Sequence, residues 1–345
     1  MNLHDLGWDD GFAASFEPFH NQGLVPGRVV AQHRGGYDVL TSTNELRARL
    51  AGRLRHEASG AGELPAVGDW VALLGETIHA VVPRRTAFAR KAAWAPTEEQ
   101  VLAANVDTVF VVSGLDGDLN LRRLERYLTL AWESGATPVL VLTKADLCED
   151  VEGALLAVEP VALGVALHAI SNVTGTGLEE LERQLRPART VALLGSSGVG
   201  KSSLANRLLG REAQATREIA DDGRGRHTTT SRQLLRLPGG ALLIDTPGLR
   251  ELQLWDAGDG IQAAFADVDE LAAGCRFNDC SHTREPGCAV QAAIDEGRLP
   301  LERLQSYRLL QRELRHLALK QDARLRSLER KKRAAFARSL RKASW

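Results

Sequence analysis

The sequence predicts an α/β protein in three parts: a small β-barrel, a doubly wound parallel sheet and a helical C-terminal domain. Residues 25–91 hold short alternating segments between Gly-rich turns, a pattern typical of a small antiparallel barrel. From about residue 100, apolar runs alternate with helical patterns, which predicts a parallel sheet with buried strands. After residue 255 the pattern is helical and is interrupted by a cluster of cysteines.

The length of the chain supports several domains, because 345 residues are many for a single hydrophobic core. We place an N-terminal extension at residues 1–24, the barrel at 25–95, the parallel-sheet domain at 100–253 and the helical domain at 254–345. For the barrel we expect the oligonucleotide-binding (OB) type. An SH3-like barrel or a β-sandwich fits the same periodicity nearly as well.

Charge is distributed unevenly along the chain. The formal net charge is −1, yet residues 301–345 contain 14 Lys+Arg against 4 Asp+Glu. Such a basic segment favours a polyanionic partner, although a solvated basic helix explains it equally well. No basic region followed by an apolar run opens the chain, and no apolar stretch approaches the roughly 20 residues that span a bilayer. We therefore expect a cytoplasmic protein, monomeric and without a membrane partner.

The expected parallel strands are apolar runs that end in polar or glycine residues. They are VDTVFVVSGL (106–115), TPVLVLTKADL (137–147), GVALHAIS (164–171), RTVALLGSS (189–197) and GALLIDTPG (240–248). A helical stripe of Leu121, Leu124, Leu128 and Trp132 lies between the first two runs. Ligands of such a sheet bind outside the carboxyl ends of its strands.

A phosphate-binding loop follows the fourth of these strands. The segment GSSGVGKS matches G-x-x-x-x-G-K-[ST] in full and precedes a helical pattern, as the motif requires. Its glycines let backbone N–H groups surround phosphate oxygens, Lys201 would reach the β- and γ-phosphates as a catalytic group, and the Ser202 hydroxyl would bind Mg²⁺. The expected contacts are Gly195, Ser196, Ser197, Gly198, Val199, Gly200, Lys201, Ser202 and the neighbouring Ser203.

Two further segments fit the γ-phosphate side of such a site. In LLIDTPG, Asp245 ends a strand where its carboxylate can hold Mg²⁺ through a water, and the Gly248 N–H can sense the γ-phosphate. The polar stretch DDGRGRHTTTSRQ lies where the first switch is expected, with Thr228 or Thr229 as the residue that completes Mg²⁺ coordination.

A base-reading motif closes the second strand. Thr143, Lys144, Ala145 and Asp146 match [NT]-K-x-D, in which the Asp carboxylate accepts the N1–H and the N2 amino group of guanine. Adenine cannot offer these donors, so the motif favours GTP over ATP. The stem of Lys144 would pack along the base, and Ser171 would lie in the loop that backs guanine with a main-chain N–H.

The order of these motifs is unusual. In ordinary GTPases the phosphate loop comes first and the base-reading motif last, whereas here residues 143–146 precede residues 195–202. A parallel sheet whose ends lie close together can be cut and rejoined in this way without a change in packing. The sequence therefore predicts a circularly permuted domain.

The sequence lacks the glutamine that orients the attacking water in many GTPases. Leu249 follows Gly248 at the position where many GTPases carry a glutamine, and an apolar side chain cannot orient water. His227 is our candidate catalytic residue, because a neutral imidazole can accept from water near pH 7. An exposed loop histidine without a catalytic role remains the alternative.

The cysteine cluster has the composition of a metal site. Cys275, Cys280, His282 and Cys288 supply three thiolates and one imidazole, a set that suits closed, structural, tetrahedral zinc. A cluster of unbonded thiols in a reducing compartment is the alternative. Cys148 stands apart, and we expect it to be a packed or exposed thiol.

Together these motifs closely resemble the ribosome small-subunit-dependent GTPases, the bacterial circularly permuted GTPases of small-subunit biogenesis. VGDWV in the barrel, TKAD before GSSGVGKSS, GRHTTT before DTPG, and C-x4-C-x-H-x5-C before a basic helix occur in one order over residues 25–330. The resemblance implies an OB barrel, a permuted GTPase core and a zinc domain. It also implies binding of the small ribosomal subunit and its rRNA, stimulation of GTP hydrolysis by the subunit, and a catalytic role for His227. A GTP-dependent regulatory module that acts on another RNA or protein is the alternative, and an ATP-dependent kinase is a third hypothesis.

Overall fold

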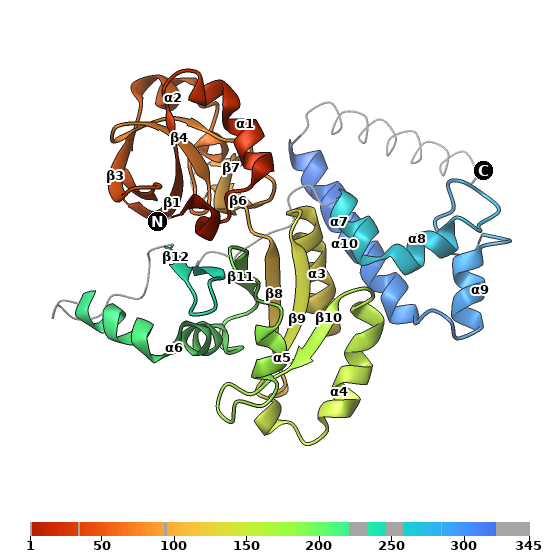
Figure 1. Ribbon diagram of the computed structural model, residues 1–345. Coiled ribbons are helices and arrows are strands. Elements are labelled where there is room, and N and C mark those ends of the chain that lie inside the picture. The colour runs from red at the N-terminus through yellow and green to blue at the C-terminus, as the bar shows by residue number, and fades with distance from the viewer. Residues whose placement is uncertain are drawn as a thin grey trace. The chain divides into compact units, whose positions relative to one another are not determined.

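The computed structural model describes residues 2–33, 35–92, 95–220, 233–245, 258–283 and 285–321 (Figure 1). The chain forms two compact units, Met1–Gln253 and Leu254–Trp345. The finer domain limits expected from the sequence stay predictions.

Five strands near the N-terminus close into a barrel. They are β1 (Val25–His33), β2 (Gly36–Leu40), β3 (Glu45–Leu50), β4 (Trp70–Leu74) and β5 (Thr77–Val81). The strand order is β1-β2-β3-β5-β4, and pairing of β1 with β4 completes the circle. Only β3 and β5 run parallel among these pairs. This closed five-stranded arrangement confirms the OB-type barrel over a β-sandwich.

The barrel is filled by alternate residues of its strands, which point inward because side chains alternate across a strand. Val29, Val39, Val71, Leu73 and Ile78 form this core and are fully buried. Between β3 and β4 the chain makes α2 (Gly52–Glu57) and η2 (Ala61–Glu63).

The segment expected as an N-terminal extension is itself structured. It forms η1 (Leu3–Leu6) and α1 (Asp10–His20), and the Asp9 carboxylate caps α1 by accepting from the N–H groups of Gly11 and Phe12 at 3.1 Å. Trp8 lies edge-on to Trp70 of the barrel, with ring centroids 4.6 Å apart. An aromatic cluster therefore fastens the first residues to the barrel.

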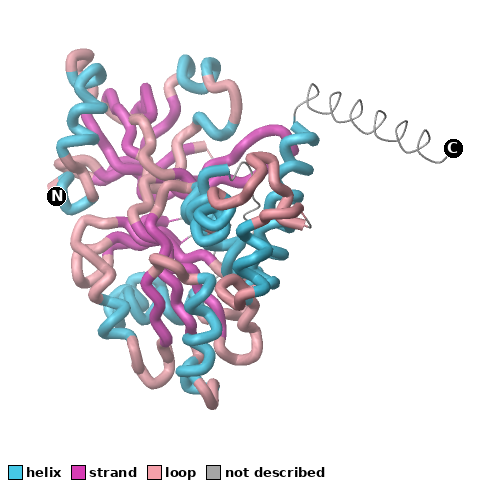
Figure 2. The backbone as a smooth tube through the Cα atoms, turned by 90° about the vertical axis from the view of Figure 1, so that its right-hand side faces the viewer, coloured by secondary structure: helices cyan, strands magenta, loops and turns pink. Residues whose placement is uncertain are grey.

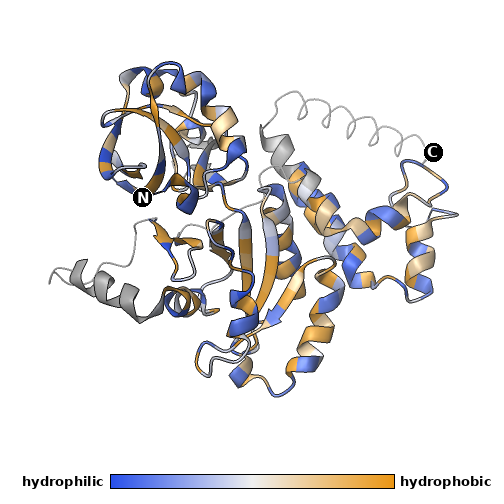
Figure 3. Cartoon of the chain, viewed as in Figure 1, coloured by the Kyte–Doolittle hydropathy of each residue, from blue (hydrophilic) through white to orange (hydrophobic). Residues whose placement is uncertain are grey.

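The core of the first unit is a parallel sheet. Its strands are β8 (Thr108–Gly114), β9 (Thr137–Thr143), β10 (Ala166–Ala169), β11 (Thr190–Leu194), β12 (Gln233–Arg236) and β13 (Leu242–Asp245). Their order is β10-β9-β8-β11-β13-β12, and β12 is antiparallel to β13. Hydrophobic residues concentrate in these strands, as buried parallel strands require (Figure 3). The expected doubly wound sheet is confirmed.

Helices cover the sheet. They are α3 (Leu121–Glu133), α4 (Val151–Val158), α5 (Leu178–Glu182) and α6 (Lys201–Ala220), with η3 (Ala145–Leu147) and η4 (Glu159–Val161). One hydrophobic core joins Phe110 and Val112 of β8 to Leu178 of α5 and Leu204 of α6. No residue of α3 belongs to that core, although α3 contacts β8 and β9, so α3 covers the opposite face. In the parallel-sheet part of the first unit the strands accordingly lie between helices (Figure 2).

One strand pairing and one hairpin connect the barrel to the core. Strand β1 pairs with β12 at Ala31 and Gln233, so that, within the described residues, barrel and core share one 11-stranded sheet. A separate two-stranded sheet of β6 (Ala87–Ala92) and β7 (Ala95–Ala104) leads from the barrel into β8.

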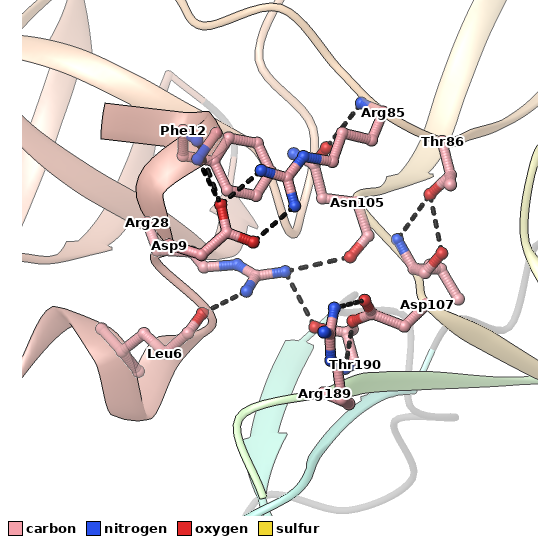
Figure 4. A network of polar contacts seen from close by, with 12 residues as sticks. Leu6, Asp9, Phe12, Arg28, Arg85, Thr86, Asn105, Asp107, Arg189 and Thr190 are labelled. Atoms are coloured by element: carbon pink, nitrogen blue, oxygen red, sulfur yellow. Dashed lines mark hydrogen bonds and ion pairs between the residues drawn. The ribbon is translucent and has the colours of Figure 1, made fainter. Parts of the chain in front are cut away.

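A buried arginine joins the barrel, the N-terminal segment and the core (Figure 4). Arg28 of β1 is 1% exposed, and it donates to the carbonyl oxygens of Leu6, Gly68 (3.2 Å) and Asn105 (3.2 Å) and to the Thr190 hydroxyl (2.9 Å). Burial lowers the pKa of Arg28 to about 10, which still leaves it charged at neutral pH.

Asp107 and Arg85 extend this junction. The Asp107 carboxylate accepts from the Thr190 N–H and from Arg189, both at 2.7 Å. Arg85 pairs with Asp9, and its guanidinium lies 3.8 Å from the centre of the Phe12 ring. Sequence reasoning missed this network, because GRVV reads as an ordinary strand until its neighbours in space are known.

The second unit is helical. It contains α7 (Gly258–Ala264), α8 (Ala266–Ala272), α9 (Ala289–Asp295) and α10 (Leu301–Gln321). Arg303 of α10 is buried and donates to the Asp267 carboxylate and the Ala264 carbonyl, while its guanidinium lies 4.2 Å from the centre of the Phe265 ring. None of the helices in the described part of the chain combines the length and the apolar character needed to cross a bilayer.

We predict that Arg28→Ala lowers the free energy of unfolding by about 3 kcal/mol or more, because it strips buried carbonyl groups of their donor. Arg47→Ala is the matched control, since Arg47 is an exposed barrel arginine paired with Asp38, and we expect it to cost less than about 1 kcal/mol. Urea unfolding followed by circular dichroism measures both variants. Equal, small effects would show that the junction is not a source of stability.

Candidate nucleotide-binding site and metal centre

The phosphate loop leaves β11 and leads into α6. Gly195, Gly198 and Gly200 have positive φ angles of 153°, 82° and 92°, which non-glycine residues rarely adopt. A Cβ atom at Gly195 would also collide with the Val112 carbonyl oxygen of the neighbouring strand β8. The glycines of the motif are therefore required by the path of the backbone.

Lys201 is folded back into this loop. Its side chain is buried, and Nζ donates to the carbonyl oxygens of Gly195, at 2.7 Å, and Ser196. Ser197, Gly198, Ser202 and Ser203 are exposed at the start of α6. A cation at the rim of an open loop and next to a helix N-terminus can exchange these carbonyl partners for phosphate oxygens.

Asp245 reaches the same edge of the sheet from the adjacent strand. Strands β11 and β13 are parallel neighbours, with Ala192 opposite Ile244, so both carry their carboxyl ends to one side. Asp245 is the last residue of β13 and is partly buried. Ser202 and Asp245 thus offer oxygen ligands of the kind that Mg²⁺ prefers, at the carboxyl end of the sheet.

The base-reading motif begins where β9 ends. Thr143 is fully buried, and its hydroxyl lies 2.5 Å from the Val199 carbonyl of the phosphate loop and 3.2 Å from the Ser113 carbonyl of β8. Lys144 takes a left-handed conformation with φ 61°, and Ala145 and Asp146 start η3. The sheet therefore brings TKAD and the phosphate loop, which are about 50 residues apart in sequence, into hydrogen-bonding contact.

Ser171 supports the base-reading carboxylate with its side chain. Its hydroxyl donates to Asp146 Oδ1 and accepts from the N–H groups of Val173 and Thr174. The main-chain N–H of Ser171 itself donates to the Thr176 carbonyl at 3.0 Å. The neighbouring Asn172 N–H has no acceptor among the described residues, so this loop has a main-chain donor available for a base.

Four of the expected site residues lie outside the described part of the chain. They are His227, Thr228, Thr229 and Gly248. Their roles stay predictions.

The metal-ligand candidates come together in the second unit. Ligand atoms of Cys275, Cys280, His282 and Cys288 all lie within 4.8 Å of one another. Cys275 Sγ is 3.5 Å from His282 Nδ1 and 3.8 Å from Cys288 Sγ, and Cys288 Sγ is 3.6 Å from the same nitrogen. Ligands around a tetrahedral zinc ion, with Zn–S near 2.3 Å and Zn–N near 2.0 Å, are separated by about 3.5–3.8 Å. The residues fit a zinc ion in both chemistry and spacing.

The surroundings shift the pKa values of the cluster in different directions. Burial, together with the nearby Arg308, lowers the pKa of His282, which favours the neutral imidazole that binds a metal. Burial opposes ionisation of Cys275, but hydrogen bonds from the N–H groups of Val290 and Ala289 and from the neighbouring thiols together lower the pKa of this thiol. Burial raises the pKa of the Cys280 thiol to about 11. Cys148 lies in the first unit, outside this cluster.

A phosphate loop, a guanine-reading motif that precedes it in the chain, and one parallel sheet that unites them define a circularly permuted GTPase. Comparison with known proteins agrees with this class. The model of the family described as RsgA GTPase matches residues 81–255, and the chain belongs to this family. The resemblance inferred from the motifs is thereby confirmed.

Relatives match nearly the whole chain. Proteins named small ribosomal subunit biogenesis GTPase RsgA from Opitutus terrae and Streptomyces coelicolor are each 50% identical to it, over 96% and 95% of this chain and 94% and 91% of theirs. The crystal structure of YjeQ from Thermotoga maritima is similar with a TM-score of 0.64 and 27% identity, covering 84% of this chain and 98% of that one. The structure of YloQ, titled a circularly permuted GTPase, matches in fold with a TM-score of 0.61.

We predict that Cys288→Ala abolishes stoichiometric zinc binding, because it removes the buried thiolate of the cluster. Cys148→Ala serves as the control and retains about one zinc ion per chain. Inductively coupled plasma mass spectrometry of the purified variants measures the metal content. Full zinc content in the Cys288 variant would contradict the assignment.

Proposed function

We propose that this GTPase acts on the small ribosomal subunit, assists its late maturation and hydrolyses GTP to GDP and phosphate when the subunit stimulates it. The relatives named small ribosomal subunit biogenesis GTPase, at 50% identity over more than nine-tenths of each chain, are the observation that carries the proposal. An OB-type barrel and a basic C-terminal segment support an rRNA partner, since both are common in nucleic-acid binding.

In the proposed reaction, water attacks the γ-phosphate in line with the leaving β-phosphate. Lys201 exchanges its contacts to the Gly195 and Ser196 carbonyls for phosphate oxygens and stabilises the charge that develops there. His227 accepts from the attacking water and orients it. The loop N–H groups and the α6 N-terminus hold the remaining phosphate oxygens.

Two metals have separate roles in this proposal. Magnesium, which supplies neutralisation of phosphate charge, would be held by Ser202, by Thr229 and, through water, by Asp245. Thr228 and the Gly248 N–H complete the contacts to the γ-phosphate side. Zinc at the Cys3His cluster is structural, because four protein ligands leave no position open for substrate. We further propose that the protein works as a cytoplasmic monomer.

We expect purified small ribosomal subunits to raise GTP turnover at least about tenfold, because a bound subunit would hold the groups that position the attacking water and the γ-phosphate. Phosphate release is measured with and without subunits, and with large subunits as the control. Co-sedimentation at moderate and high salt tests binding separately. If small subunits neither raised the rate of phosphate release nor co-sedimented with the protein, a regulatory module for another partner would be favoured.

Asp146→Asn should shift base preference from guanine to xanthine, because the new amide can donate to the xanthine C2 carbonyl but can no longer accept from both the N1–H and the N2 amino group of guanine. We expect the ratio of the XDP to the GDP dissociation constant to fall by about 100-fold or more. Asp150→Asn is the control, since Asp150 is exposed and caps α4. Isothermal titration calorimetry measures both ratios, and an unchanged ratio would remove Asp146 from the base site.

A further inference from the structure

The loop that follows β8 carries an acidic residue beside the base-reading motif. Asp116 Oδ2 accepts from Lys144 Nζ, and the two side chains are 30% and 28% exposed. Sequence analysis assigned no role to Asp116, whereas Lys144 is the residue whose stem we expect to pack along the base. The ammonium group of this lysine is thus held by a partner from the loop that follows the neighbouring strand β8.

The backbone around this pair is shaped to bring the two side chains together. The Leu115 N–H donates to the Thr143 carbonyl at 2.9 Å and ties the ends of β8 and β9. A Cβ atom at Gly114 would lie 2.5 Å from Asp116 Oδ1 and 3.6 Å from Lys144 Cδ. The absence of a side chain at Gly114 therefore leaves room for the Asp116 carboxylate and the adjoining lysine stem.

The loop itself is anchored on both sides of Asp116. Asn120 caps α3 by accepting from the Arg123 N–H at 3.0 Å, and Arg123 pairs with the Asp118 carboxylate at 2.8 Å. Asp116 consequently projects from a segment with a defined conformation. The Lys144 ammonium also holds the pKa of Asp116 below its usual range, so the carboxylate is charged at neutral pH.

An ion pair of this exposure contributes little to folding. Its effect on binding is different, because a free lysine side chain loses rotamer freedom when it packs against a base. A lysine that is already held loses less. We propose that Asp116 is a positioning residue of the guanine site, which holds Lys144 by its ammonium group so that the methylene stem is in place for the base. This inference rests on the base-reading role proposed for residues 143–146.

Asp116→Asn tests the proposal in the full chain. We expect the dissociation constants of GDP and GTP to rise by the same factor, about three- to tenfold, while turnover at saturating GTP stays unchanged. The affinity for tripolyphosphate, which has no base, should also stay unchanged. Asp118→Asn is the matched control, because it lies in the same loop but pairs with Arg123. An equal loss of tripolyphosphate affinity, or unchanged guanine-nucleotide affinity, would overturn the proposal.

A double-mutant cycle with Lys144→Met separates positioning from a general effect on the loop. The methionine keeps an apolar stem but removes the ammonium group, so each single variant should weaken GDP binding. The double variant should bind GDP no more weakly than the more affected of the two single variants. Additive losses would contradict the proposal. If the unaltered protein bound no guanine nucleotide, the proposed site would fail as a whole. If it bound GDP tightly and the Asp116 variant bound equally well, only this inference would fail.

Discussion

The parallel pairing of β8 with β11 is the interaction on which the nucleotide site depends. It runs from Thr108 opposite Val191 to Val111 opposite Leu194, and it joins the half of the sheet that reads the base to the half that binds phosphate. Because both strands are parallel, their carboxyl ends meet at one edge. Thr143 can therefore contact the Val199 carbonyl of the phosphate loop. A permuted chain order is compatible with this site, since the sheet specifies neighbours in space and not their order along the chain.

A second constraint fixes the barrel to this sheet. Arg28 is buried at the point where the N-terminal segment, the barrel and the start of β11 converge, and it donates to carbonyl groups of the first two and to the Thr190 hydroxyl at the start of β11. The junction also includes β12, which pairs with β1 and is antiparallel to β13. The strand that ends at Asp245 is thus only one strand removed from the barrel. Barrel and GTPase core form one compact unit because polar groups buried between them are paired.

Local motifs were predictable, and long-range partners were not. The phosphate loop, TKAD and the cysteine cluster could be identified because each carries its chemistry within a few residues. Helix α1 was missed although Asp9 is a capping residue, since the short segment is stabilised mainly by its contacts with the barrel, such as that of Phe12 with Trp70. The hydrogen bond from the Ser171 N–H to the Thr176 carbonyl was not predictable, because the turn that brings the two groups together exists only in the folded loop.

The sequence by itself determined the class of the protein: the permuted order of motifs, the preference for guanine and a Cys3His ligand set. These follow from residue types at fixed spacings, which reflect short-range chemistry. Only the tertiary structure decided that the barrel is of the OB type, that Arg28 joins it to the core, and that Asp116 faces Lys144. Each of these depends on residues from different strands that meet at one place. The hydrophobic periodicity of the sequence does not specify which strands become neighbours, so such contacts are known only once the sheet has formed.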